Sequence, residues 1–453
     1  MARRDALAGS SVPFTTFFVT AAALLFVIAG ASSAHAAIPA VPKIDGADTA
    51  WVLLSAVLVL MMTIPGLALF YGGMVRRKNV LSTLMQSFIL AGLVSIQWVL
   101  FGYSIAFAPG SGFAGTLSWA GLAGVSATQA YAPYSATIPH QAYMIYQCMF
   151  AIITPALITG AIAERMTFKG FVIFSLLWTT LIYDPLAHWV WGSDGWIHAM
   201  GAMDFAGGTV VHISSGAAAL AGALLVGKRR GYLKEHMAPH NLTLTITGAG
   251  LLWVGWFGFN AGSSLAADGL AVSAFVATHL GAAAAMLSWV AVEWFVAGKP
   301  TTLGAASGAV AGLVAITPAS GYVGPVPAIA IGIVAGGLCF GAVRMKSLFG
   351  YDDALDVVGV HMVGGIWGAL ATGIFASVAI NAAGGNGLIR GNPHQLLVQA
   401  IAVVASVAFS FVGSAVLFKV TDALVGIRVD DEGQYMGLDL SEHEENAYAF
   451  VEG

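Results

Sequence analysis

Charged side chains are scarce in this sequence of 453 residues, of which only 9% are Asp, Glu, Lys or Arg. Soluble globular domains carry about 25% charged residues, so the shortage excludes an ordinary water-soluble domain. Hydrophobic residues make up 58% of the chain, and they recur in runs of about twenty, the length that a helix needs to cross a bilayer. The sequence therefore predicts an all-α polytopic membrane protein.

Cysteine is almost absent, and Cys148 and Cys339 both lie in apolar runs. Two such residues exclude a disulfide framework and favour packing over redox chemistry. The patterns Glu-x-x-His and His-Glu-x-x-His are also missing, which leaves a zinc site without support. We expect no metal, no cofactor, no nucleic-acid partner and no catalytic residue, so the chain is predicted not to be an enzyme.

The first 36 residues have the features of an export signal. Arg3 and Arg4 precede the apolar core "FFVTAAALLFVIAG", and Ala34-His35-Ala36 fits a small-x-small cleavage site. We expect residues 1–36 to be a cleaved signal peptide, residues 37–427 a transmembrane domain and residues 428–453 a cytoplasmic regulatory tail. An uncleaved first helix is the alternative, because a signal and a short span share an apolar core.

The apolar runs after the signal divide into eleven predicted spans. With the mature N-terminus outside, fourteen of the 18 lysines and arginines fall on the cytoplasmic side, and only Lys43 and Arg390 fall outside. This asymmetry is what the positive-inside rule requires, so we predict an N-out, C-in topology. The spans are 50–74, 79–107, 140–163, 168–190, 204–227, 239–262, 270–297, 302–320, 324–343, 357–380 and 395–425.

Two predicted spans contain a histidine that follows an acid at or next to the start of the span. The first is "DFAGGTVVHISSG", with Asp204 and His212, and the second is "LDVVGVHMVGGIWGALATG", with Asp356 and His361. A charge at mid-bilayer costs on the order of 2.5–3.5 kcal/mol even on mild scales, which makes these groups functional candidates. The two segments lie five spans apart, and an odd number inverts the topology. The pattern predicts two inverted five-helix repeats and a final helix, with the histidines meeting at the repeat interface.

Other interpretations of the histidines remain open at this point. A single intramembrane histidine often satisfies a neighbouring carbonyl, and we assign no role to His279 for that reason. Haem ligation is a more specific alternative. Membrane proteins that bind haem through pairs of histidines usually carry two histidines on each helix, whereas each of these two helices has only one.

Aromatic side chains gather around a hydroxyl. "YQCMF" places Tyr146 and Phe150 one turn apart, "WVGWFGFNAGS" places Phe259 one turn before Ser263, and Trp191 follows "YDPLAHWV". Interface aromatics are usually membrane anchors. A cluster that includes a hydroxyl can also hold a small cation, since cation–π attraction reaches about 2 kcal/mol when the pair is desolvated.

These motifs together resemble the ammonium transporter family (Amt, Mep and Rhesus proteins), and the bacterial Amt type in particular. The segments that carry the resemblance are "GAIAERM" (160–166), "DFAGGTVVHI" (204–213), "GWFGFNAGS" (255–263), "ASGAVAGLVAITPASG" (306–321) and "LDVVGVHMVGGIWG" (355–368). They are spread over most of the mature chain.

The resemblance implies roles for individual residues. Trp191, Tyr146 and Ser263 match the external recruitment site for ammonium, with the conserved acid Asp204 below it. Phe150 and Phe259 match the paired phenyl rings of the pore gate, and His212 and His361 match the twin histidines of the pore. Gln147 matches an amide beside the recruitment aromatics, and Asp356 matches a cytoplasmic-side acid.

The resemblance also implies how the protein works and what it binds. The expected function is movement of ammonium or ammonia into the cell through a hydrophobic pore, after deprotonation at the outer vestibule. A homotrimer in the cell (inner) membrane and a PII-type signalling partner at the cytoplasmic face are implied as well. The alternatives are a passive channel for ammonia or carbon dioxide and an ammonium sensor.

Overall fold

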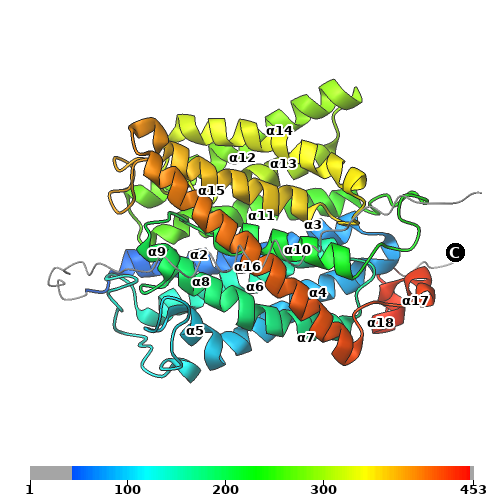
Figure 1. Ribbon diagram of the computed structural model, residues 1–453, viewed down its shortest axis with the longest axis horizontal. Helices are drawn as coiled ribbons and strands as arrows, with labels where there is room; N and C mark the ends of the chain where they lie inside the picture. The colour runs from blue at the N-terminus through cyan, green and yellow to red at the C-terminus, as the bar shows by residue number, and fades with distance from the viewer. Residues whose placement is uncertain (1–42, 449–453) are drawn as a thin grey trace, which may run out of the picture. The chain divides into compact units, whose positions relative to one another are not determined.

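The computed structural model describes residues 43–448, and Figure 1 shows their arrangement. Within this part of the chain every extended regular element is a helix, and β pairing is limited to three isolated bridges. The all-α prediction is thereby confirmed. The predicted signal peptide lies outside the described residues.

The helices fall into two successive groups along the chain, and several spans contain a π-helical turn or end in a short 3-10 helix. The first group is α2 (Gly46–Met61), α3 (Ala68–Met74), α4 (Val80–Gln97), α5 (Tyr103–Phe107), α6 (His140–Ile162), α7 (Phe168–Trp178), α8 (Asp184–Trp191), α9 (Trp196–Ala199) and α10 (Ser214–Leu225). The second group is α11 (Leu242–Ala261), α12 (Gly269–Ala297), α13 (Thr302–Ile316), α14 (Pro325–Phe349), α15 (Val363–Phe375), α16 (Pro393–Val425), α17 (Asp431–Met436) and α18 (Leu438–His443). The π-helical turns are η1 (Met62–Leu67), η3 (Trp98–Gly102), η5 (Thr179–Tyr183), η6 (Gly208–Ile213) and η8 (Val358–Met362), and the 3-10 helices are η2 (Arg77–Asn79), η4 (Ala120–Leu122), η7 (Gly262–Ser264) and η9 (Leu388–Arg390).

Every predicted span has a helical counterpart. Ten helices in the described residues are long and apolar enough to cross a membrane, and the shorter apolar helix α13 takes the place of the eighth predicted span. The eighth span ends at Ile316 rather than at residue 320, because Pro318 has no backbone N–H group to continue the helical hydrogen bonds. The fourth continues past residue 190 to Ala199. The chain is therefore a multi-pass membrane protein.

The helices α6 and α10 form the centre of the bundle. The most apolar window of α6 is 89% buried within the described residues and that of α10 is 83% buried, against 39% for α12. A lone membrane helix would expose its apolar side chains to lipid on all sides, so this burial marks the two helices as internal. Both predicted free cysteines are also buried, as expected for packing residues.

The two histidine-bearing segments cross at close range, and a glycine on each permits the crossing. Gly216 follows His212 by four residues, and a Cβ there would lie 2.4 Å from the backbone nitrogen of Met362. Gly365 follows His361 by four residues, and a Cβ there would lie 3.1 Å from the Cβ of His212. Small residues allow such close approach of helices in lipid. The reciprocal contact agrees with the predicted inverted repeat.

A carboxyl group away from both histidines is fully buried between α4, η5 and α8. Asp184 is 0% exposed, and its Oδ2 accepts a 2.6 Å hydrogen bond from Nε2 of Gln97. Within residues 43–448, Asp184 Oδ1 and Gln97 Oε1 have no hydrogen-bond partner, and no ion pair involves Asp184. Because an unpaired ionised carboxylate is costly in a membrane interior, a neutral acid suits this position.

We expect Asp184→Asn to keep at least wild-type stability. An asparagine would still accept from Gln97, and its amide could donate to the unpartnered Oε1. Asp184→Ala removes the acceptor and leaves one N–H of the Gln97 amide without a hydrogen bond, which should lower the free energy of unfolding by about 1–3 kcal/mol. The measurement is thermal unfolding of both purified variants in detergent. A variant Asp184→Asn that unfolds as readily as Asp184→Ala would show that the position requires an ionised carboxylate.

Candidate functional site

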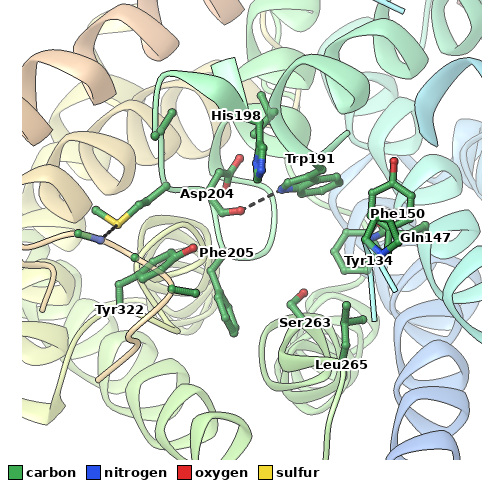
Figure 2. A pocket seen from close by; sticks show the side chains of 18 of the residues that line it. Tyr134, Gln147, Phe150, Trp191, His198, Asp204, Phe205, Ser263, Leu265 and Tyr322 are labelled. Atoms are coloured by element: carbon green, nitrogen blue, oxygen red, sulfur yellow. Dashed lines mark hydrogen bonds between the residues drawn. The ribbon is translucent and has the colours of Figure 1, made fainter. Parts of the chain in front are cut away.

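A pocket of about 520 Å³ opens among α6, α8, the segment before η6, and η7. Its wall includes most of the predicted recruitment residues, and Figure 2 shows them from close by. We call it the aromatic pocket. The predicted residues that line it are Gln147, Phe150, Trp191, Asp204 and Ser263.

Tyr146 lies behind the wall of the aromatic pocket rather than in it. Its side chain is 0% exposed, and its hydroxyl lies 2.9 Å from the carbonyl oxygens of both Gly258 and Phe259. The same hydroxyl lies 3.2 Å from Oγ of Ser263. These contacts tie α6 to the end of α11 and orient the serine hydroxyl, so the geometry favours a positioning role over direct contact with a ligand.

Two phenyl rings close the floor of the aromatic pocket. The rings of Phe150 and Phe259 lie 4.3 Å apart between centroids and are tilted by 34°, and both residues are almost fully buried. The ring of Trp191 stands edge-on to Phe150 at 5.9 Å, and its Nε1 donates a 2.9 Å hydrogen bond to the backbone oxygen of Asp204. The indole is therefore held in one orientation in the wall of the aromatic pocket.

The carboxylate of Asp204 caps the first turn of η6. Oδ1 accepts hydrogen bonds from the backbone nitrogens of Gly207 and Gly208 at 2.8 and 2.6 Å. Oδ2 accepts from the nitrogens of Thr209 and Val210 at 2.8 and 3.3 Å, and from the Thr209 hydroxyl. The carboxylate thereby satisfies the backbone N–H groups at the start of η6. Both oxygens already accept several hydrogen bonds, which leaves them little capacity to bind a ligand directly.

The two histidines meet on the other side of the phenyl rings. Nδ1 of His361 lies 3.3 Å from Nδ1 of His212, and both side chains are buried. A neutral imidazole has one donor and one acceptor nitrogen, so one Nδ1 carries the hydrogen and the other accepts it. The indole of Trp256 stacks on His212 at 5.4 Å and 23°, which holds the ring in this plane.

A small apolar cavity, which we call the histidine cavity, lies beside the imidazole pair. Its volume is about 10 Å³, and its wall includes His212, His361, Trp256 and Phe259. One water-sized molecule needs about that much space. Nε2 of His212 has no hydrogen-bond partner within the described residues, so a small donor or acceptor in the cavity would find an unused ring nitrogen.

The counterpart of Asp204 in the second half is Asp353, not the Asp356 that the sequence analysis paired with His361. Asp353 accepts from the backbone nitrogens of Val357 and Val358 at 3.1 and 2.8 Å, and thereby caps η8. Asp356 pairs instead with Lys346. The signal was present in the sequence, because "DFAGGTVVH" and "DALDVVGVH" both place an acid eight residues before the histidine. Burial raises the pKa of Asp353 to about 6.

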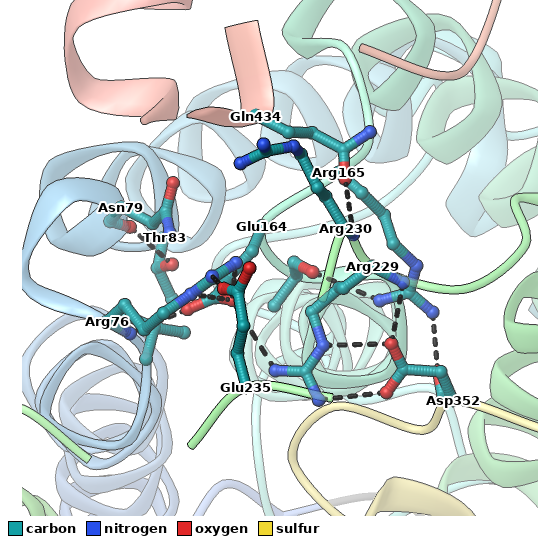
Figure 3. A network of polar contacts seen from close by, with 12 residues as sticks. Arg76, Asn79, Thr83, Glu164, Arg165, Arg229, Arg230, Glu235, Asp352 and Gln434 are labelled. Carbon is teal, nitrogen blue, oxygen red and sulfur yellow. Dashed lines mark hydrogen bonds and ion pairs between the residues drawn. The ribbon is translucent and has the colours of Figure 1, made fainter. Parts of the chain in front are cut away.

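An ion-pair network lies at the opposite end of the bundle from α9 (Figure 1), and Figure 3 shows it from close by. The sequence did not predict it. The guanidinium of Arg76 lies 2.8 Å from Glu164, and that of Arg229 lies 2.8 Å from Asp352 and 3.4 Å from Glu164. Burial alone would raise the pKa of Glu164, but Arg229 and Arg76 outweigh it and lower that pKa. These residues lie far apart in the sequence, so no local sequence pattern predicts the network.

The predicted tail packs against the same end of the bundle (Figure 1). Nζ of Lys78 donates a 2.9 Å hydrogen bond to the backbone oxygen of Gln434, and the backbone nitrogen of Ser82 donates a 2.9 Å bond to Asp439. The backbone nitrogen of Leu438 donates to Asn79 at 2.8 Å. The helices α17 and α18 are therefore held at the start of α4.

An aromatic pocket, a closed pair of phenyl rings and a buried imidazole pair follow one another inside a multi-pass helical bundle. This arrangement is typical of a membrane transport protein. The model of the Ammonium Transporter Family matches residues 50–448, and the chain belongs to that family.

Individual relatives agree with this assignment. The chain is 52% identical over 402 residues to an ammonium transporter from Bacillus subtilis, a match that covers 88% of this chain and 98% of the relative. Among solved structures, it matches Mep2 from Candida albicans with a TM-score of 0.83 at 36% identity, over 90% of this chain and 93% of that one. A structure described as a sensor Amt protein matches with a TM-score of 0.80 at 28% identity, over 88% of this chain and 98% of that one.

Proposed function

We propose that this protein imports ammonium by binding the ion in the aromatic pocket and passing ammonia along the twin-histidine pore. The observation that carries the proposal is the direct contact of His212 and His361 behind the closed rings of Phe150 and Phe259. Membership of the ammonium transporter family supports the substrate.

The physical argument starts from desolvation. An ammonium ion that entered the apolar histidine cavity would lose its hydration, which costs far more than the cavity can return. In the proposed mechanism Trp191 and Ser263 bind NH4+ in the aromatic pocket, and the charge of Asp204 favours the cation there. The ion then splits into NH3 and a proton near the phenyl rings. Potassium has no proton to lose, so the same pore would exclude it.

The proton needs a route of its own if charge is to cross. Since the imidazoles share one hydrogen bond, the pair would titrate as a unit, and double protonation would be disfavoured. The pair could accept the proton at one ring nitrogen and release it from another while ammonia moves past. Transport by this route would be electrogenic.

Further parts of the proposal rest on the family resemblance. They are an inner-membrane location with the N-terminus outside, a cleaved signal at residues 1–36, a homotrimer with one pore in each subunit, and a PII-type signalling protein bound at the cytoplasmic face. The docked position of α17 and α18 beside Lys78 and Ser82 supports a regulatory role for residues 428–453.

A sensor role is the second candidate, because a sensor Amt protein shares the fold at 28% identity. A passive gas channel is the third. The histidine cavity has room for neutral ammonia, which a passive channel would carry without charge. A measurement of current distinguishes such a channel from an electrogenic transporter.

We expect an ammonium jump to evoke a transient current in liposomes that contain the purified protein. Sodium and potassium jumps of equal size should evoke none, because neither ion can shed a proton. Protein-free liposomes provide the control. If the protein speeds ammonia equilibration without current, the passive channel replaces the proton relay, and if it does neither, the transport proposal fails in favour of the sensor.

A further inference from the structure

The aromatic pocket is much larger than the ion that it is proposed to bind. Its volume is about 520 Å³, whereas one water molecule, which is close to ammonium in size, needs only about 10–15 Å³ of such volume. The residues discussed so far occupy only part of its wall. Another part of the wall, which we call the rear lobe, is formed by Met203, Phe205, Tyr322, Gly385 and Gln395.

The hydroxyl of Tyr322 belongs to the wall of the rear lobe and forms no hydrogen bond within residues 43–448. Figure 2 shows it pointing toward the open space below Asp204. The ring stands edge-on to Phe205 at 5.7 Å, and a Cβ on Gly384 would lie 2.7 Å from it, so its position is fixed. Burial and then the charge of Asp204 raise the pKa of Tyr322. The hydroxyl therefore stays neutral, with lone pairs that a cation can use.

Gln395 presents a second oxygen to the same space. Its Nε2 donates to the backbone oxygen of Gly201 at 2.9 Å and reaches Oε1 of Gln399 at 3.5 Å, which fixes the orientation of the amide. Oε1 is left to face Gly385, where a Cβ would lie 2.9 Å from it. No hydrogen bond to Gln395 Oε1 is formed within residues 43–448, and because the amide nitrogen is engaged, the free atom is an acceptor.

We propose that the rear lobe is a second binding position for ammonium, formed by the Tyr322 hydroxyl and Gln395 Oε1 within the field of Asp204. This inference rests on the proposed function and deepens it. Two oxygen acceptors and one nearby negative charge suit a small cation that donates hydrogen bonds, and alkylammonium ions such as methylammonium share that chemistry. An ion held there lies in the same pocket as Trp191 and Ser263, so it can pass to them without crossing a barrier of protein.

Tyr322→Phe tests the site because it removes only the hydroxyl. In liposomes we expect the KM for radiolabelled methylammonium uptake to rise at least threefold, with the maximal rate unchanged, since the Trp191 position and the pore are intact. Tyr131→Phe is the matched control, because Tyr131 lies in the loop before α6 and is not part of the pocket wall. An unchanged KM in Tyr322→Phe overturns the inference.

Caesium offers a readout that does not depend on transport. It is a monovalent cation heavy enough to locate in crystals by anomalous scattering. We expect one peak near Trp191 and Ser263 and another between Tyr322 and Gln395, with the second absent from Tyr322→Phe crystals. A peak at the first position alone overturns the second site and leaves the proposed function standing, whereas failure of wild-type uptake would reject the proposed function itself.

Discussion

Replacing both His212 and His361 with alanine should lower the ammonium-evoked current at least tenfold, which corresponds to about 1.4 kcal/mol in the barrier for charge transfer. His212 and His361 touch each other through their Nδ1 atoms at 3.3 Å, and they are the titratable groups in the wall of the histidine cavity. Without them a proton released at the phenyl rings has no carrier through that apolar space. Neutral ammonia should still pass. The measurement is current and ammonia flux in the same liposomes.

His279→Ala is the matched control for the double histidine variant. His279 lies on α12, with its ring 5.6 Å from Trp253 and 6.3 Å from Phe257, and it lines neither the aromatic pocket nor the histidine cavity. Its loss should leave the current unchanged. A double variant with wild-type current and selectivity would rule out the relay, and a double variant that conducts potassium would show that the imidazoles exclude ions instead.

Asp204→Ala should prevent the protein from accumulating in a folded state. Five donors lose their acceptor at once, and four of them are backbone N–H groups at the start of η6. An unsatisfied buried donor costs about 1–3 kcal/mol, so the total is on the order of 4 kcal/mol or more even if the turn relaxes. Total stabilities are only about 5–15 kcal/mol. The measurement is the amount of folded protein after extraction into detergent.

Asp268→Ala isolates the general effect of losing a helix cap. Asp268 caps α12 through a single hydrogen bond from the nitrogen of Ala271 at 2.9 Å, so its loss should cost about 1 kcal/mol and leave the protein folded. Asp204→Asn separates charge from capping, since it keeps one acceptor oxygen. Wild-type yield and thermal stability in Asp204→Ala would contradict the role that the geometry gives to this carboxylate.

Sequence periodicity predicted the spans well because lipid imposes one rule on every helix. Each run had to be apolar for about twenty residues, and lysine and arginine marked the cytoplasmic ends. The helix ends were predicted less well where one residue decides them. Pro318 ended α13 early, and Gly207, with its φ of 114°, delayed the start of η6 until after the Asp204 cap.

The sequence predicted correctly which site residues lie close together, but it did not predict the contacts that each of them makes. The motifs placed Trp191 and Ser263 in one pocket and His212 against His361. They did not show that Tyr146 lies behind Ser263, or that Asp353 rather than Asp356 caps the second histidine segment. Hydrogen bonds to backbone nitrogens and contacts between residues distant in sequence leave almost no trace in composition. The tail contacts and the Arg76–Glu164–Arg229 network were missed for the same reason.

The close crossing at Gly216 and Gly365 also dictates an order of events during synthesis. His212 and its partner are separated by 149 positions along the chain, and ribosomes add about 5–20 residues per second. The first histidine segment therefore waits roughly 7–30 s before the second can emerge and lie across it. During that interval His212 and Gly216 lack the packing partners that the second segment supplies, so the contact between the two histidines forms only after most of the chain has been made.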